Sequence, residues 1–329
     1  MNPLTGLYGA ATALRNRLYD RGTLSSRRLE RPVVSVGNLS AGGSGKTPFV
    51  IALGELLKAR GIRFDVLSRG YGRKTHGVRI VEDYGSAADF GDEPLLIARK
   101  LGVPVIVGGS RYAAGRVAER KFETQLHILD DGFQHRSLAR DFDIVLMTER
   151  DFDDKLLPSG RLREPLSSLS RADAVVLPAG LVADYPLSRR DAACRVSRAA
   201  YQQKPHWRIE RKIVLPHLPA APVVFCGIAR PEQFFAQVRA AGIKPAAEIA
   251  FRDHHAYDRS DIERLDAMRD KLGAAGFLTT EKDMVNLGTL LAEPELDPFT
   301  IATLTVTLDH PTEIVDTILT RIAERKPRS

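Results

Sequence analysis

The strongest chemical signal in the sequence is a glycine-rich run between a short apolar segment and a helical pattern. The run ends in Gly45-Lys46-Thr47. In such a loop, glycines let backbone N–H groups close around phosphate oxygens, the lysine neutralises the β- and γ-phosphates, and the threonine hydroxyl reaches a magnesium ion. The run therefore predicts a nucleotide-phosphate site. Its candidate nucleotide-binding residues are Ser40, Ala41, Gly42, Gly43, Ser44, Gly45, Lys46 and Thr47.

One position of this loop departs from the usual phosphate-binding pattern. The pattern has a glycine five residues before the glycine that precedes the lysine, and Ser40 stands there. Gly42 and Gly43 are candidates to supply the backbone freedom instead. A chance Gly-Lys-Thr is the alternative, and the position between a strand and a helix argues against it.

Two adjacent carboxylates, Asp130 and Asp131, follow a second apolar segment and precede Gly132. A strand that ends in an aspartate is where a P-loop enzyme places its metal-directed carboxylate. Neighbouring residues at a strand end point in different directions, so one carboxylate could face magnesium while the other positions a substrate or a lysine. An acidic turn is the alternative, because Asp-Gly is common in turns.

Asp92 and Glu93 open another predicted helix, in the run Gly91-Asp92-Glu93-Pro94. Carboxylates in a first helical turn are ordinarily capping and dipole residues, and taken alone these two fit that interpretation best.

Two loops carry clustered cations. Residues 68–74 hold three cations and two glycines, which suits a sugar-phosphate as well as it suits solvent, and residues 158–165 form a second basic loop. In Asp253-His254-His255 the adjacent histidines would face opposite ways on a strand, so we do not expect them to share a metal. Thr280-Glu281-Lys282-Asp283 is similar to the guanine-specificity motif of GTPases, but its spacing is wrong and GTP specificity is not supported.

Short β-branched runs alternate with helical patterns from residue 33 onward. The sequence predicts strands at 33–36, 64–67, 103–107, 127–129, 144–146 and 174–177, with helices at 47–60 and from 111. After a softer region between 178 and 205, strands are expected at 209–215, 223–225 and 300–308, with helices from 231 and over 258–272. This alternation predicts an α/β fold, in which the loops at the strand carboxyl ends form the site. We expect a mostly parallel P-loop domain over 1–184 and a smaller α/β domain over 185–329.

The composition fits a chain with a packed core. Of its 329 residues, 43% are hydrophobic and 27% charged, which excludes disorder of the whole chain. The formal net charge of +7 favours an anionic partner, either nucleic acid, a membrane surface or a phosphorylated substrate. Cys194 and Cys226 are too few for a disulfide framework, so we expect a reducing, intracellular compartment. No run approaches the roughly 18 apolar residues of a spanning helix, and the N-terminus lacks the pattern of a signal peptide.

The first 30 residues form a distinct segment that predicts a basic amphipathic helix. Its apolar residues at helical spacing are Leu4, Leu7, Tyr8, Ala11, Leu14 and Leu18. The arginines around and after them are Arg15, Arg17, Arg21, Arg27 and Arg28. Such a helix can lie in a membrane interface. Packing on the body of the protein is the alternative, and the residues alone do not choose between the two.

Taken together, these blocks resemble one family, the tetraacyldisaccharide 4′-kinases, which are the lipid A 4′-kinases of Gram-negative bacteria. The resemblance covers residues 1 to about 285, and the combination is far more specific than any one block. The matching blocks are Gly37-Asn38-Leu39 with Ser40 to Pro48, Ser68-Arg69-Gly70-Tyr71-Gly72, Gly91-Asp92-Glu93-Pro94, Asp130 to His135, Cys226-Gly227-Ile228-Ala229 with Pro231, Asp253-His254 and Thr280-Glu281-Lys282-Asp283. The family's own loop is similar to the variant with Ser40.

The resemblance implies an activity and a location. A member of this family transfers the γ-phosphate of ATP to the 4′-hydroxyl of tetraacyldisaccharide 1-phosphate, at the cytoplasmic face of the bacterial inner membrane. The implied partners are ATP, this lipid and the membrane surface, to which the N-terminal segment would attach the protein peripherally. Nucleic acid then drops out as a partner, and the active site is expected in the cleft between the two domains.

The resemblance also implies roles for individual residues. Asp92 would orient the attacking hydroxyl, His254 would reach Asp92 from the second domain, and Lys46 would complete the catalytic set by neutralising the transferring phosphoryl group. The expected cofactor is Mg²⁺, with candidate ligands Thr47, Glu93, Asp130 and Asp131. Candidate substrate-binding residues are Asn38, Arg69, Tyr71, Arg111, Gln134, His135, Arg163 and Glu164, of which Arg163 could also face the phosphoryl group.

Two other functions stay open at this point. A P-loop kinase or ligase of a soluble metabolite would show activity without lipid or detergent. A nucleotide-switched protein recruited to membranes by its N-terminus would be a slow ATPase without a phosphate acceptor.

Overall fold

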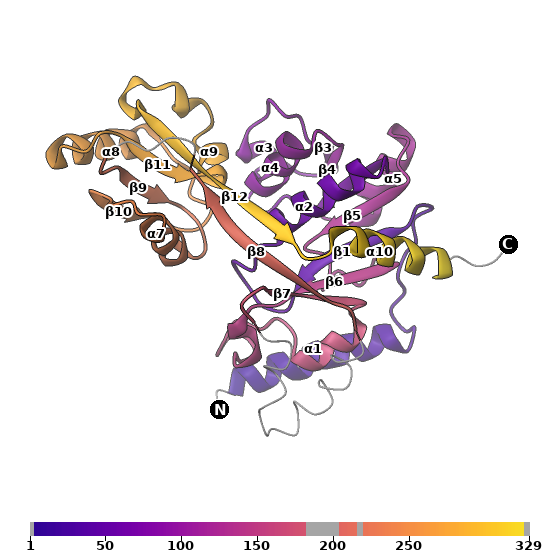
Figure 1. Ribbon diagram of the computed structural model, residues 1–329. Helices are drawn as coiled ribbons and strands as arrows, with labels where there is room; N and C mark the ends of the chain where they lie inside the picture. Colours follow the sequence, from indigo (N-terminus) through magenta and orange to yellow (C-terminus); the bar gives the residue numbers. More distant parts are fainter. Residues whose placement is uncertain (1–2, 182–203, 216–219, 326–329) are drawn as a thin grey trace.

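The computed structural model describes residues 3–181, 204–215 and 220–325 (Figure 1). Its strands form a twelve-stranded sheet in the order β10-β9-β11-β12-β8-β7-β6-β1-β5-β2-β4-β3. The strands are β1 (Val33–Asn38), β2 (Phe64–Ser68), β3 (Arg79–Ile80), β4 (Val105–Val107), β5 (Leu126–Asp130), β6 (Phe142–Leu146), β7 (Ala174–Pro178), β8 (His206–Val214), β9 (Val223–Cys226), β10 (Ala247–Ala250), β11 (Phe277–Thr280) and β12 (Phe299–Leu308). The helices are α1 (Pro3–Asp20), α2 (Lys46–Ala59), α3 (Ala87–Phe90), α4 (Asp92–Leu101), α5 (Arg111–Lys121), α7 (Pro231–Ala240), α8 (Arg259–Leu272), α9 (Glu281–Leu287) and α10 (Pro311–Arg325).

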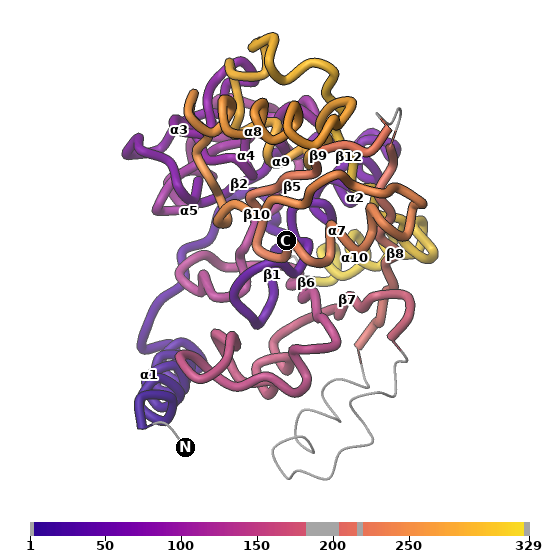
Figure 2. The backbone as a smooth tube through the Cα atoms, turned by 90° about the vertical axis from the view of Figure 1, so that its left-hand side faces the viewer, coloured from indigo at the N-terminus to yellow at the C-terminus, as the bar shows by residue number. Residues whose placement is uncertain are grey.

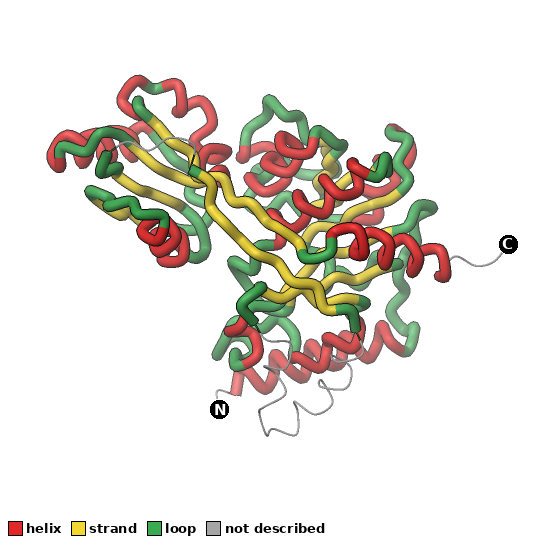
Figure 3. Tube along the Cα trace, in the orientation of Figure 1, coloured by secondary structure: helices red, strands yellow, loops and turns green. Residues whose placement is uncertain are grey.

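Strand β1 lies between β5 and β6 and pairs with both in parallel, with Val34 opposite Ile128 on one side and Phe142 on the other. Every residue of β1, β2, β5 and β6 is buried. Both faces are covered, as a parallel sheet requires. Helices α2, α4 and α10 pack on the face that includes Val34, and α5 packs on the face that includes Leu67 (Figure 3). The carboxyl ends of β1, β2 and β5 therefore bring their following loops together at one edge.

Two long strands join this part of the molecule to a second lobe, which we define as residues 220–298. Strands β8 and β12 are antiparallel, with Ile209 opposite Leu308 at one end and Val214 opposite Thr303 at the other. Beyond them, the second lobe has its own core around Phe225. Figures 1 and 2 show this lobe at one end of the molecule, on the far side from α1.

The C-terminal helix α10 returns to the first lobe. It packs against α2 and β6, and Arg60 pairs with Asp316 at 2.9 Å. The expected domain boundary near residue 185 falls in 182–203, outside the described residues. In the described part, the sheet continues from β7 through β8 and β12 into the second lobe.

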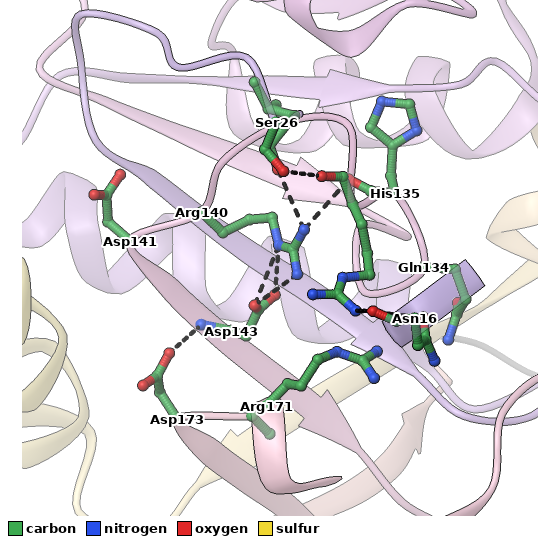
Figure 4. A network of polar contacts seen from close by, with 12 residues as sticks. Asn16, Ser26, Gln134, His135, Arg140, Asp141, Asp143, Arg171 and Asp173 are labelled. Atoms are coloured by element: carbon green, nitrogen blue, oxygen red, sulfur yellow. Dashed lines mark hydrogen bonds and ion pairs between the residues drawn. The ribbon is translucent and has the colours of Figure 1, made fainter. Parts of the chain in front are cut away.

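Helix α1 lies against loops at the other side of the first lobe. The Tyr8 hydroxyl donates to the Arg163 carbonyl at 3.0 Å, and the Asn16 amide donates to Glu164 at 2.7 Å. Figure 4 shows Asn16 beside the segment that carries Gln134. Across the described residues, no helix is both long enough and apolar enough to span a bilayer.

The elements expected from the sequence match this architecture closely, and the α/β, P-loop class is confirmed. The strand expected over 103–107 begins later, at Val105. The residue before β4 is Pro104, which has no N–H to donate to a neighbouring strand.

Candidate active site

The glycine-rich loop follows β1 and leads into α2, as the sequence predicted. Gly42, Gly43 and Gly45 all have positive φ, so the glycines after Ser40 do supply the left-handed conformations of the turn. The Ala41 N–H donates to the Arg161 carbonyl at 2.8 Å, which ties the loop to the segment before Arg163. Lys46 begins α2, whose N-terminal N–H groups favour anions.

Lys46 points back toward the end of β5. Its Nζ donates to Asn38 Oδ1 at 3.1 Å and lies 3.3 Å from Asp131 Oδ1. Arg163 approaches the same carboxylate with both terminal nitrogens, each at 3.0 Å, and donates to Asn38 Oδ1 at 2.5 Å. Burial opposes ionisation of Asp131, but Lys46 and Arg163 outweigh it and hold the Asp131 pKa far below its usual range. Asp131 is thus an ionised carboxylate that holds the Lys46 and Arg163 side chains.

Asp130 has a different environment. Its Oδ2 accepts from Ser68 at 3.1 Å, while its Oδ1 is buried without a hydrogen-bond partner in the described residues. Burial and the charges of Glu93 and Asp131 raise the Asp130 pKa to about 7. A buried carboxylate whose pKa is raised by neighbouring carboxylates marks a place suited to a cation.

The fit of a magnesium ion can be judged from these donors. The described residues contain no cluster of three or more His, Cys, Asp or Glu side chains able to hold a metal by themselves. Magnesium in nucleotide sites takes one or two carboxylates and otherwise phosphate oxygens and water. The free oxygen of Asp130 and the hydroxyl residue Thr47 at the start of α2 match that smaller demand.

Asp92 is placed by a close approach of two backbone segments. It is the first residue of α4, after Gly91 with φ 91°. A Cβ on Gly91 would lie 2.8 Å from the Tyr71 carbonyl, so only glycine lets the helix begin against this loop. The Asp92 side chain is 3% exposed and accepts from the Glu93 N–H at 2.9 Å. A carboxylate at a helix N-terminus is stabilised in its charged form.

His254 reaches Asp92 from the second lobe. Its Nδ1 lies 2.8 Å from Asp92 Oδ2 and 3.0 Å from Oδ1. The backbone of His254 is left-handed, with φ 57°, and its N–H donates to the Gly227 carbonyl at 3.1 Å. Burial opposes the charge of both partners, but their contact prevails: the Asp92 pKa is lowered and the His254 pKa is raised. The pairing expected from the resemblance is thus present in the geometry.

Two residues that sequence analysis gave no role join this pair. Lys282 Nζ lies 3.3 Å from His254 Nε2, 3.6 Å from Asp92 Oδ2 and 3.0 Å from Asp253 Oδ1. Asn286 donates to Asp92 Oδ2 at 3.3 Å. Because the Lys282 ammonium can only donate to Nε2, the proton of a neutral His254 ring lies on Nδ1. The Nδ1–H group then donates a hydrogen bond to Asp92. The run Thr280-Glu281-Lys282-Asp283 drew attention to Lys282 in the sequence. Its similarity to a GTPase motif, however, could not predict the contact of Lys282 with His254 and Asp92.

The two adjacent histidines have different partners, although they lie at a turn and not on a strand. His255 turns to Asp261, at 2.7 Å from Oδ2, and stacks on Phe251 at a ring distance of 4.6 Å. Tyr71, expected to bind substrate, lies with its ring 5.1 Å from that of His254 and is 62% exposed.

Arg111, Arg69 and His135, which were also expected to bind substrate, lie close enough together to influence one another's charge. Arg111 begins α5 and its Nε is buried without a partner in the described residues. Burial lowers the Arg111 pKa, and the charge of Arg69 lowers it further. Burial and the charge of Arg111 also lower the pKa of His135, to about 4. Arg15 of α1 donates to the Gln134 carbonyl at 2.7 Å. Arg69 and Arg111 repel one another, while the charges of Asp131 and Asp130 act on Arg111 in the opposite direction. Guanidinium groups clustered in this way suit a bound anion.

Gln134 and Glu164 serve the framework. The Gln134 amide donates to the Asn38 carbonyl at 3.0 Å, and Glu164 accepts from Arg171 at 2.9 Å as well as from Asn16 of α1. Glu164, 1% exposed, therefore links α1 to the loop of Arg163.

The fold and the site together define a class. A phosphate loop at the carboxyl edge of a parallel sheet shares that edge with a carboxylate–histidine pair, and the charges of Lys46 and Lys282 both act on Glu93 beside the pair. This is the arrangement of a P-loop phosphotransferase.

Comparisons with known proteins give the particular family. The model of the family described as tetraacyldisaccharide-1-P 4′-kinase (LpxK) matches residues 1–323. A tetraacyldisaccharide 4′-kinase of Koribacter versatilis is 48% identical over 338 residues, covering 99% of each chain, and one of Aquifex aeolicus is 39% identical over 298 residues, covering 87% and 88%. A crystal structure of LpxK from Aquifex aeolicus in complex with ATP has a TM-score of 0.76 at 34% identity, covering 97% of this chain and 98% of that one. The chain belongs to the tetraacyldisaccharide 4′-kinase family, and the resemblance found in the sequence is confirmed.

Proposed function

We propose how the residues of this site divide the work of phosphoryl transfer. The chain is an ATP-dependent kinase of lipid A biosynthesis, which moves the γ-phosphate of ATP to the 4′-hydroxyl of tetraacyldisaccharide 1-phosphate. The observation that carries the division of roles is the contact of His254 with Asp92 at the edge that holds the phosphate loop.

Asp92 is the residue that receives the proton of the attacking hydroxyl. Its lowered pKa keeps it ionised at neutral pH, with Oδ1 and Oδ2 both turned toward His254. A low pKa limits its strength as a base. In a loose phosphoryl-transfer transition state, however, the hydroxyl loses its proton late, so orientation matters more than basicity. His254 orients the carboxylate through Nδ1–H, and Lys282 fixes the ring from the other side.

Lys46 and Arg163 neutralise the transferring phosphoryl group. Both now rest on Asp131 and Asn38, which holds two flexible side chains beside the loop until phosphate arrives. Preorganised cations of this kind stabilise developing charge without reorganisation during the reaction.

Magnesium would be held by Asp130 and Thr47, with Glu93 close to the ion. When bound with ATP, it neutralises the charge of the β- and γ-phosphates. The uncommitted Oδ1 of Asp130 supports this assignment over Asp131, whose two oxygens are already taken by Arg163.

The lipid enters between α1 and the catalytic pair. Arg69 and Arg111 form an electropositive place for the 1-phosphate, with the neutral His135 ring near them, and Tyr71 offers a ring face beside His254 for a sugar. The Arg111 Nε there is buried without a hydrogen-bond partner in the described residues.

Helix α1 attaches the protein peripherally to the cytoplasmic face of the inner membrane. Leu4, Leu7 and Leu14 are 59%, 68% and 58% exposed and recur along one side of the helix. Tyr8 and Asn16 face the body instead and hold the loop of Arg163 and Glu164. One side of α1 therefore packs on the protein, and the side with the exposed leucines is free to enter a membrane. This arrangement supports an interfacial helix with its apolar face in the lipid.

Transfer of labelled γ-phosphate from MgATP tests this function. We expect labelled lipid when tetraacyldisaccharide 1-phosphate is supplied in detergent micelles, and none when soluble sugars replace it. Label found only in inorganic phosphate would support a nucleotide-switched protein, and label on a soluble acceptor would support a metabolite kinase.

A further inference from the structure

A side chain of β8 lies directly on the phosphate loop. The Arg211 Nη2 donates to the Ser44 carbonyl at 2.5 Å. A Cβ placed on Gly45 would be 2.5 Å from Arg211 Cζ, so the guanidinium covers the backbone at the start of α2. Gly45 is the N-cap residue of α2, where the helix presents free N–H groups to an anion. Arg211 therefore stands at the place where a phosphate would bind.

A second arginine reaches the loop from the second lobe. Arg230 precedes α7, and a Cβ on Gly43 would be 2.9 Å from its Nε. Its neighbour Ala229 lies against Gly42, at 3.8 Å from a Cβ placed there. The phosphate loop is thus enclosed by residues that lie more than 160 positions later in the chain.

The donors of these two arginines are not used up by the protein. The Arg211 Nε is buried without a partner, and so are Nε and Nη2 of Arg230, within the described residues. Within the described part of the chain, neither the Arg211 nor the Arg230 guanidinium forms an ion pair with a carboxylate. Burial lowers the Arg211 pKa to about 10, and the charge of Arg230 adds to this, yet the group stays charged at neutral pH.

The charged residues around Arg230 do not balance its positive charge. Burial lowers its pKa, the charges of Arg161 and Arg150 act in the same direction, and Asp151 opposes them only in part. Buried donors without acceptors and like charges held together are both unfavourable unless an anion joins them.

We propose that Arg211 and Arg230 are ligands of the ATP triphosphate, supplied to the phosphate loop from β8 and from the second lobe. The loop amides and Lys46 hold the phosphates from one side, and the two guanidiniums hold them from the other. Guanidinium groups suit this use because they bind phosphate oxygens with two parallel hydrogen bonds. The proposal rests on the ATP-dependent activity given above.

The same segment connects the nucleotide to the catalytic pair. The Gly227 carbonyl accepts from the His254 N–H, and Gly227 N–H is held by Asp283 at 2.7 Å. Residues 227–230 therefore touch both the phosphate loop and the backbone of His254. Phosphate binding by Arg230 would steady the segment that seats His254 on Asp92.

Nucleotide titration of the full-length protein tests the proposal. Arg211→Gln and Arg230→Gln are compared with Arg208→Gln, an exposed arginine on the same strand as Arg211. Calorimetry with a non-hydrolysable MgATP analogue should show Kd raised about tenfold or more for the first two variants and unchanged for Arg208→Gln. With AMP, which lacks the β- and γ-phosphates, the difference should largely vanish.

Several results would overturn the proposal. An unchanged Kd for both arginine variants would show that the guanidiniums do not touch the nucleotide. A tighter Kd for Arg211→Gln would show that Arg211 obstructs the loop. Should Arg211→Gln fail to fold, Arg230→Gln and Arg211→Lys test the same claim. Failure of the unaltered protein to bind the analogue would instead count against the kinase function itself.

Discussion

His254 Nδ1 lies 2.8 Å from Asp92 Oδ2, although the two residues are 162 positions apart in the chain. One belongs to the second lobe and the other to the first turn of α4. This contact brings together the two lobes at the edge of the sheet where the phosphate loop lies. In the proposed mechanism this contact gives Asp92 a catalytic role, although a carboxylate at a helix N-terminus would by itself be an ordinary capping residue.

Removing the imidazole should slow the chemical step without weakening ATP binding. His254→Ala leaves Asp92 without its Nδ1–H donor, so kcat should fall by about a hundredfold. The KM for ATP should stay within about twofold, because His254 does not touch the phosphate loop. Steady-state kinetics in micelles measures both. His255→Ala, whose ring contacts Asp261 instead, is a test of whether any nearby histidine would have the same effect.

Lys282→Met should lower kcat by about ten- to a hundredfold, the range of a lost hydrogen bond to a charged group. In the proposed mechanism Lys282 fixes the tautomer of His254, so its loss should change the pH–rate profile. If Lys282 had a purely structural role, its loss would change the stability of the protein but not the pH–rate profile. We expect the apparent pKa of the acidic limb to shift upward, because Asp92 loses a nearby positive charge. Lys271→Met, at an exposed position of α8, serves as the matched control, and equal losses in both variants would contradict the assignment.

The contact between the lobes should also make stability depend on pH. The lowered Asp92 pKa gives stability that is present above the unfolded value near 4 and is lost as pH falls through the folded pKa. The raised His254 pKa gives stability that is present below the unfolded value near 6.5 and is lost as pH rises through the folded pKa. The difference in Tm between the parent and His254→Ala should therefore be largest between about pH 4 and 6.5. A difference that grows above pH 8 would contradict this.

The exposed face of α1 should be needed at a bilayer. Replacing Leu4, Leu7 and Leu14 by Ser removes the apolar residues offered to lipid, so vesicle binding and activity on bilayer-embedded substrate should fall at least tenfold. Activity in detergent micelles should change much less, because Tyr8 and Asn16 still hold the Arg163 loop. Leu272→Ser, at an exposed leucine of α8, controls for lost surface hydrophobicity. Unchanged vesicle partitioning would rule out α1 as the anchor.

The sequence revealed the parts of the site that lie within one loop. The strand, the glycine-rich run and Lys46 follow one another in the chain, and Asp130 ends a strand of unmistakable apolar pattern. Asp92 was ambiguous by itself, because its helix position has a bland explanation, and only the order of the family's blocks pointed to it. The contacts of Lys282, Arg211 and Arg230 could not be predicted, because they depend on the way β8 and β12 bring the second lobe to the phosphate loop, which no local sequence pattern records.

The central claim is that Asp92 takes the hydroxyl proton as phosphate is transferred, and the most direct measurement is a single-turnover rate. Parent enzyme and Asp92→Asn are mixed with saturating MgATP and tetraacyldisaccharide 1-phosphate in micelles, and labelled 4′-phosphorylated lipid is followed by rapid quench. Asparagine keeps the shape of the side chain but cannot accept the proton. We predict that the transfer rate falls by about 10² to 10⁴-fold while ATP binds as before. Equal single-turnover rates for the two proteins would contradict the account.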